Sequence, residues 1–165
     1  MAETQKNGDS SLDLNQWDQL DEDALRTMFA IELSGQAFYA ALAGKVDNQE
    51  AAKLLGNNGR EEAGHARRLL RALSLKVGHD VDPTPEMLTP GTIPLPDSIS
   101  PGLFSTILEA ELDGDVSYQR WAENEPNPEV ARLLQLNGRE ESIHANRVEQ
   151  VLTLLTPSFG SLGSA

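Results

Sequence analysis

The residues best suited to chemistry in this chain are two copies of a Glu-x-x-His pattern, each with a further glutamate 30 residues before it. Residues three apart share a helix face, so the glutamate and histidine of one copy point the same way. Four carboxylates and two imidazoles are ligands that suit iron or manganese, and zinc is a further candidate. The chain has no cysteine, which excludes thiolate and iron–sulfur sites. The six candidate metal ligands and catalytic residues are Glu32, Glu62, His65, Glu111, Glu141 and His144.

The pattern occurs twice because the chain contains an internal repeat. Pairing each residue with the one 79 positions later aligns residues 28–73 with residues 107–152 without a gap, and 19 of the 46 pairs are identical. The identical pairs include the run Asn-Gly-Arg-Glu-Glu at 58–62 and at 137–141. Helical amphipathicity would reproduce leucine and alanine positions, but it would not reproduce this polar run. The repeat therefore indicates a duplicated structural unit.

Each unit is predicted to form two helices, and no segment has the alternation of a strand. Asp21 can cap the first helix, and Asp47 with Glu50 three residues later has the spacing of a capping box. In the second unit, Pro101 and Pro128 stand at or near the first helical position, where proline is favoured. The fold class is therefore all-α. The expected helices cover about 21–43, 47–77, 102–123 and 128–155.

The segment between the units, 78–99, is rich in proline and cannot continue a helix. About twenty extended residues reach up to ~70 Å, more than the ~40 Å length of these helices. The short links then form antiparallel hairpins, while the long link can cross the whole bundle. This is the connectivity of a ferritin-like four-helix bundle. The expected organisation is a flexible acidic tail at 1–18, the bundle at 19–155 with repeat units at about 21–77 and 100–155, and a flexible tail at 156–165.

Counting along the helices places the six candidate ligands in one layer. Glu32 lies about twelve residues before the first hairpin turn and Glu62 about fifteen after it, so both are roughly 18–22 Å from the turn. Glu111 and Glu141 repeat this relation in the second hairpin. An isolated buried carboxylate costs several kcal/mol, and two divalent cations would remove that cost. One glutamate from each of two helices with Glu-x-x-His from the other two is the ligand pattern of dimetal carboxylate bundles. We therefore predict two iron ions per chain, with manganese or zinc as alternatives.

With these motifs, residues 21–155 resemble the rubrerythrin branch of the ferritin-like superfamily, including the erythrins and symerythrins that lack a rubredoxin tail. The resemblance implies that Glu62 and Glu141 bridge the two metals. It further implies that the site reduces peroxide or dioxygen with electrons from an external donor. The sequence departs from classical rubrerythrins at Gly114, whose repeat mate is Gly35, because the family has an extra glutamate there. The resemblance assigns the remaining ligands to separate ions, Glu32 with His65 and Glu111 with His144.

Four further residues are expected to surround the ligands. A metal-bound histidine usually donates its other ring proton to a carboxylate or a carbonyl. We expect the two glutamates beside the bridging positions to accept these protons, with Arg60 and Arg139 balancing their charge. The two tyrosines lie seven residues beyond the first glutamate of each unit, where they would fill the core or hydrogen-bond a ligand carboxylate. The four residues are Glu61, which would accept from His144, Glu140, which would accept from His65, and Tyr39 and Tyr118.

A net charge of −13 disfavours binding to nucleic acid or anionic membrane and attracts cations. The sequence has no long apolar run and no signal peptide, so we expect a soluble, cytoplasmic protein. Three functions stay open: a peroxide- or dioxygen-reducing oxidoreductase, a ferroxidase that handles iron, and an inert metal-binding scaffold. A homodimer is a plausible assembly. The ending at 159–164 faintly resembles the tails that load cargo into encapsulin shells, although a plain Ser/Gly tail is the more economical interpretation.

Overall fold

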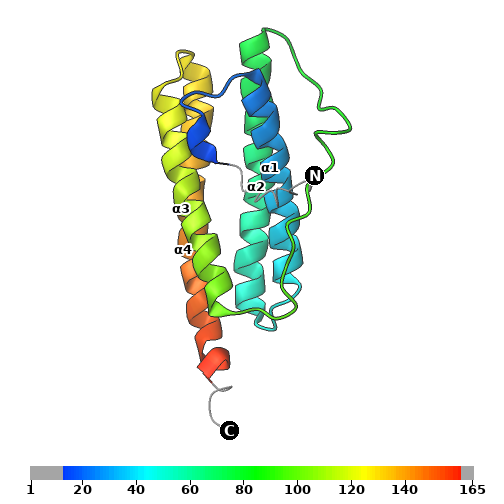
Figure 1. The fold of residues 1–165 in the computed structure, drawn as a ribbon, viewed down its shortest axis with the longest axis vertical. Helices are drawn as coiled ribbons and strands as arrows, with labels where there is room; N and C mark the ends of the chain where they lie inside the picture. The colour runs from blue at the N-terminus through cyan, green and yellow to red at the C-terminus, as the bar shows by residue number, and fades with distance from the viewer. Residues whose placement is uncertain (1–12, 161–165) are drawn as a thin grey trace, which may run out of the picture.

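The chain forms four long helices arranged as two antiparallel hairpins (Figure 1). The computed structural model describes residues 13–160, and the side chains up to residue 156. No strand occurs among these residues, which confirms the predicted all-α bundle. The elements are the 3₁₀ helix η1 at Leu14–Gln16, α1 at Glu22–Ala43, α2 at Gln49–Val77, α3 at Pro101–Glu123 and α4 at Pro128–Gly160.

The proline-rich crossover between α2 and α3 lies along α1 and returns the chain to the other end of the bundle (Figure 1). The Gly91 amide donates to the Ser34 hydroxyl at 2.8 Å, and further along Lys45 donates to the Pro96 carbonyl at 3.0 Å. A side chain of α1 and one of the turn after it thus satisfy backbone groups that the proline-rich segment cannot pair within itself. The result is that α3 begins beside the first hairpin turn.

The helix starts follow ordinary capping chemistry, with one difference from the prediction. Asp21 caps α1, because its carboxylate accepts from the Ala24 amide at 2.8 Å. The cap of α2 is Asn48 and not Asp47: the Asn48 side chain accepts from the Ala51 amide at 3.0 Å. An N-cap side chain must reach the amide two or three residues on, and Asn48 is the residue that does so here.

The ordered bundle is longer at both ends than the sequence indicates. The indole of Trp121 donates to the Trp17 carbonyl at 2.8 Å, and Arg120 donates to the Leu14 carbonyl at 3.0 Å. Residues 13–18, expected to belong to a tail, therefore lie against α3. Helix α4 continues to Gly160, five residues past its expected end. The rest of the expected tails, 1–12 and 161–165, and with it most of the encapsulin-like ending, lies outside the described residues.

Two apolar clusters fill the bundle, one on each side of a polar layer. One cluster contains Leu25, Leu69 and Trp121, and the other contains Leu42 and Val151. Helices α2 and α4 pack directly against each other at the centre, whereas the backbones of α1 and α3 stay farther apart. None of the helices in the described part of the chain has both the length and the apolar character needed to cross a membrane.

Candidate metal centre

The structure brings all six predicted ligands together between the two apolar clusters, and every one of them is buried. Their ligand atoms form two overlapping groups, and within each group these atoms lie within 4.8 Å of one another. Two glutamates belong to both groups, which places them between two possible ion positions. The first group is Glu32, Glu62, His65 and Glu141, and the second is Glu62, Glu111, Glu141 and His144.

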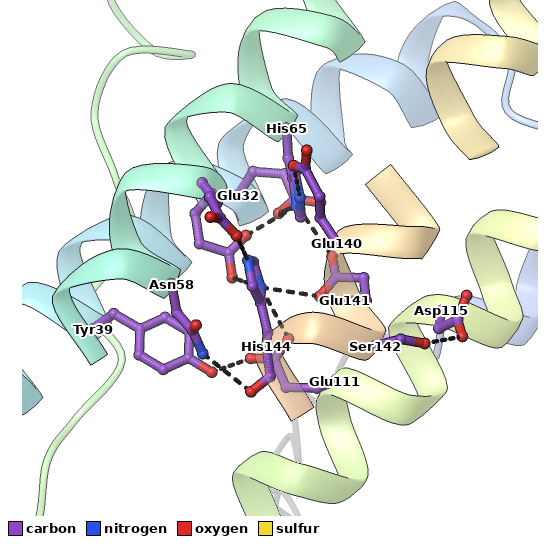
Figure 2. Close-up of polar contacts among 12 residues, drawn as sticks. Glu32, Tyr39, Asn58, His65, Glu111, Asp115, Glu140, Glu141, Ser142 and His144 are labelled. Carbon is purple, nitrogen blue, oxygen red and sulfur yellow. Dashed lines mark hydrogen bonds and ion pairs between the residues drawn. The ribbon is translucent and has the colours of Figure 1, made fainter. Parts of the chain in front are cut away.

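The two histidines lie at the centre of this layer (Figure 2). The rings of His65 and His144 are stacked, with centroids 5.2 Å apart and planes inclined by 17°. Each ring comes from one of the two central helices, α2 and α4, so the stack lies where the hairpins meet. This arrangement follows from the repeat, because each hairpin supplies the same pair of groups to a shared layer.

The outer nitrogen of each histidine is bound to a carboxylate from the opposite hairpin. His65 Nε2 lies 3.0 Å from Glu140, and His144 Nε2 lies 3.1 Å from Glu61. These are the partners expected from the sequence. An Nε2–H that donates to a carboxylate leaves Nδ1 as the free lone pair, and both Nδ1 atoms face the buried carboxylates.

The arginines that balance these outer carboxylates differ from the predicted ones. Arg68 pairs with Glu140, and Arg147 binds both oxygens of Glu61 at 2.7 and 2.9 Å. The prediction of Arg60 and Arg139 was wrong, because a residue directly before a glutamate points about 100° away around the helix. Arg60 instead contacts Asn57 on its own helix surface. Arg68 is three residues after His65 and so shares the inward face.

The tyrosines hydrogen-bond across the bundle. The Tyr39 hydroxyl donates to Glu111, and the Tyr118 hydroxyl donates to Glu32, so each phenol binds a glutamate of the other hairpin. Burial, reinforced by the neighbouring carboxylate, raises the pKa of both phenols well above their usual value. Both tyrosines therefore keep their protons at neutral pH and fix the orientation of the two outer ligand glutamates.

Two buried asparagines also support the site, and the sequence analysis assigned them no role. The Asn58 amide donates to the His144 carbonyl at 3.3 Å, and the Asn137 amide donates to the His65 carbonyl at 3.4 Å. Neither residue is exposed to solvent. The signal was present, because both asparagines open the repeated Asn-Gly-Arg-Glu-Glu run. Their contacts cross from one hairpin to the other, which sequence spacing within one helix does not predict.

The donor atoms fit a metal pair. Among the described residues, His65 Nδ1 and His144 Nδ1 are two of the few buried polar side-chain atoms without a hydrogen-bond partner. His65 Nδ1 lies 3.1–3.4 Å from carboxylate oxygens of three glutamates, and His144 Nδ1 lies 3.4–3.6 Å from three. Fully buried polar atoms are rarely left unpaired unless another partner binds them. Two imidazole nitrogens and four carboxylates aimed at one space therefore form a site that can hold metal.

The protonation pattern without metal shows how the layer stays neutral. Burial raises the pKa of Glu32 well above its usual value and that of Glu111 to about 8. Burial opposes ionisation of Glu62 too, but the two histidines beside it outweigh burial and lower its pKa. The same balance lowers the pKa of Glu141. The neighbouring carboxylates likewise overcome burial and raise the pKa of His65, and they raise that of His144 to about 12. Two anions then face two imidazolium cations.

The two glycines that depart from the classical pattern lie against the shared glutamates. A Cβ atom added at Gly114 would meet Cγ and Cδ of Glu141 at 3.4 Å, and one added at Gly35 would meet Cδ of Glu62 at 3.4 Å. Both glycines also line a cavity beside the site. Each glycine is therefore both packed against a shared glutamate and part of the cavity wall.

Two antiparallel hairpins, a long crossover and a mid-bundle layer of glutamate and histidine define the class of this protein: it is a ferritin-like four-helix bundle with a site that can hold metal. Residues 23–90 match the family model described as Rubrerythrin, which is consistent with a rubrerythrin-like member of this class and supports the resemblance. No curated protein and no solved structure gave a match. The second hairpin lies outside the matched residues and is related to the first by the internal repeat.

Proposed function

We propose that this protein is a diiron oxidoreductase of the rubrerythrin type, which reduces peroxide or dioxygen with electrons from an external donor. Two iron ions bound in the buried layer would supply the redox chemistry and the coordination positions for the oxidant. The observation that carries the proposal is the pair of overlapping ligand groups, because only the shared glutamates bring two metal positions into one site.

Each residue of the layer has a distinct part in this proposal. Glu62 and Glu141 would bind both ions, because they belong to both ligand groups. The other four ligands would each bind one ion, as the resemblance implies. Glu61 and Glu140 hold the Nε2 protons of the histidines, which fixes the rings with Nδ1 toward the site. The protein thus prepares the ligand directions before any metal binds.

The tyrosines hold protons close to the ligands. Each phenol keeps its O–H, as the raised pKa indicates, and donates it to an oxygen of Glu32 or Glu111. This hydrogen bond leaves the second oxygen of the glutamate to face the site. Reduction of a peroxide consumes protons, and these buried hydroxyls are protonated groups in direct contact with ligand carboxylates.

Metal analysis combined with rapid kinetics tests the proposal. Protein produced with iron should contain about two iron ions per chain, separated by the ~3.5–4 Å of two-metal sites. Stopped-flow mixing of the reduced protein with peroxide and with oxygen should show which oxidant reacts faster. A site with about one ion per chain, or with iron that neither oxidant oxidises, would contradict the proposal.

The acidic surface favours one second candidate. A net charge of −13 draws cations toward the protein, as an iron-oxidising, iron-handling protein requires. The two functions differ in stoichiometry, because a ferroxidase continues to oxidise added ferrous iron after its own site is filled. Oxidation of many ferrous ions per chain, without an added electron donor, would assign the protein to iron handling.

A further inference from the structure

A cavity of about 400 Å³ lies beside the metal-ligand layer, between α1 and α3. It exists because the backbones of these two helices stay apart, while each helix packs closely on its own hairpin partner. Leu14 from η1 and Ile93 from the crossover contribute to its walls. Small-molecule sites are typically about 300–1,000 Å³, so this space is far larger than dioxygen or peroxide requires.

The walls are apolar except where the ligand layer forms one side. Ile31 and Phe38 line the cavity from α1, and Ile107 and Ala110 line it from α3. The carboxyl groups of the candidate metal centre are the ionisable acids that border it. A molecule in this cavity would therefore touch hydrocarbon over most of its length and would have one end next to the metal ligands.

Each hydroxyl, phenol and indole group that lines the cavity is already bonded within the protein. The two phenols donate to Glu111 and Glu32, the Thr106 hydroxyl donates to the Gly102 carbonyl at 3.2 Å, and the Trp121 indole donates to the Trp17 carbonyl at 2.8 Å. A ligand rich in hydrogen-bond acceptors would lose its hydrogen bonds to water and would find no free hydroxyl or N–H group to replace them. The cavity therefore selects against polar molecules.

The charges around the cavity select against anions. None of the described residues that line it is lysine, arginine or histidine. A carboxylate or phosphate headgroup would find no basic side chain and would approach the four ligand glutamates instead. From the size, the apolar walls, the occupied donors and the absence of cations in the lining, we propose that this cavity binds a neutral aliphatic chain, such as that of a fatty alcohol, with one end against the metal-ligand layer.

This inference rests on the proposed function only for the chemistry at the end of the bound aliphatic molecule that lies next to the metal ligands. The cavity itself is formed by protein side chains and needs no metal. Binding can therefore be measured in the full-length protein with and without iron. We expect isothermal titration calorimetry to show saturable binding of 1-decanol to both forms. In the metal-free form, decanoate should bind at least about tenfold more weakly, because no basic side chain lines the cavity to pair with its charge.

Two matched phenylalanine variants locate the binding. Ala110→Phe places a ring in the cavity from an exposed position of α3, and Ala37→Phe places the same ring on an exposed position of α1 outside the cavity. Ala110→Phe should weaken 1-decanol binding by about tenfold or more, and Ala37→Phe should change it by less than about twofold. Ala110→Glu, which adds charge with less bulk, should weaken it too. Circular dichroism melts verify that each variant is folded.

The outcomes separate this inference from the proposed function. Two iron ions per chain without decanol binding would overturn the inference and leave the proposed function standing. Decanol binding without iron binding would support the cavity as a binding site and contradict the proposed function. Decanol binding that Ala110→Phe leaves unchanged would place the ligand elsewhere and overturn the inference. A dimer that Ala110→Phe dissociates in sedimentation, with no decanol binding, would show that a second copy covers the cavity and would overturn it as well.

Discussion

The two hairpins supply the same ligands to the centre but differ just outside it. In the second hairpin, the Ser142 hydroxyl donates to Asp115 at 2.5 Å, and the Gln119 amide donates to Asp115 at 3.1 Å. The repeat-related residues of the first hairpin are Ala63, Gln36 and Ala40, which cannot form this bridge. The six ligands, the two tyrosines and the two asparagines are identical in the two hairpins, whereas the residues of this bridge differ.

The asparagines show the same contrast within one motif. Both donate to a histidine carbonyl of the other hairpin, but the side-chain oxygens have different surroundings. Arg147 donates to the Asn58 oxygen at 3.1 Å, whereas the Asn137 oxygen has no partner among the described residues. The two copies of the motif therefore need not contribute equally to stability. The comparison suggests that the two hairpins must match at the ligands and can differ in the contacts around them.

The largest expected effect is the difference between shared and unshared ligands. Glu62→Ala or Glu141→Ala should reduce iron from about two ions per chain to near zero, because each carboxylate belongs to both ligand groups. Glu32→Ala or Glu111→Ala should leave about one ion. Elemental analysis of the four purified variants measures this directly. Equal losses in all four would show that the site does not divide into shared and single ligands.

The second expected effect is a release of protons when metal binds. The pKa of Glu111 is raised to about 8 and that of His144 to about 12, so both groups carry protons at pH 7 in the metal-free protein. Metal must displace these protons, so its apparent affinity should rise as the pH increases from about 6 to 8. Calorimetry in buffers of different ionisation enthalpy counts the protons released. An affinity independent of pH would mean that the metal-free layer is already deprotonated.

The asparagines should differ in their contribution to stability. Asn58→Ala removes two cross-hairpin hydrogen bonds, and Asn137→Ala removes one. At about 1 kcal/mol for each bond, with a further cost for buried groups left unpaired, Asn58→Ala should lower the free energy of unfolding by about 2–3 kcal/mol and Asn137→Ala by about 1–2 kcal/mol. Urea denaturation of the metal-free proteins makes the comparison. A larger loss of unfolding free energy for Asn137→Ala than for Asn58→Ala would show that the number of hydrogen bonds does not determine the contribution of these residues.

The repeat made the central layer predictable from the sequence. A gapless offset of 79 residues, with glutamate and histidine three apart, fixed which groups share a helix face and which share a height. The histidine partners Glu61 and Glu140 followed from the usual chemistry of metal-bound imidazole. These predictions depend on spacing within a helix or on a local chemical rule, which sequence contains.

Contacts between helices were less predictable. The choice of Arg68 over Arg60, and the donation from each tyrosine to the glutamate of the other hairpin, depend on how the hairpins face each other. The docking of Leu14 and Trp17 on α3 depends on a surface that forms only after the bundle has folded. The cavity between α1 and α3 has no sequence signal, because it arises where the backbones of two helices stay apart.

The smallest expected effect concerns the outer asymmetry itself. Asp115→Gln gives the second hairpin the residue of the first and removes the carboxylate that binds Ser142 and Gln119. These contacts are partly exposed and lie outside the ligand layer, so the free energy of unfolding should fall by at most about 1 kcal/mol. Iron content should stay at about two ions per chain, because Asp115 belongs to neither ligand group.

Gln36→Asp in the first hairpin is the matched control and should likewise leave the iron content unchanged, since Ala63 offers no hydroxyl to bind. Urea denaturation and elemental analysis decide the outcome. Loss of one iron ion from Asp115→Gln alone would show that the asymmetry reaches the Glu111 and His144 side of the site, and that the two metal positions are inequivalent because of it.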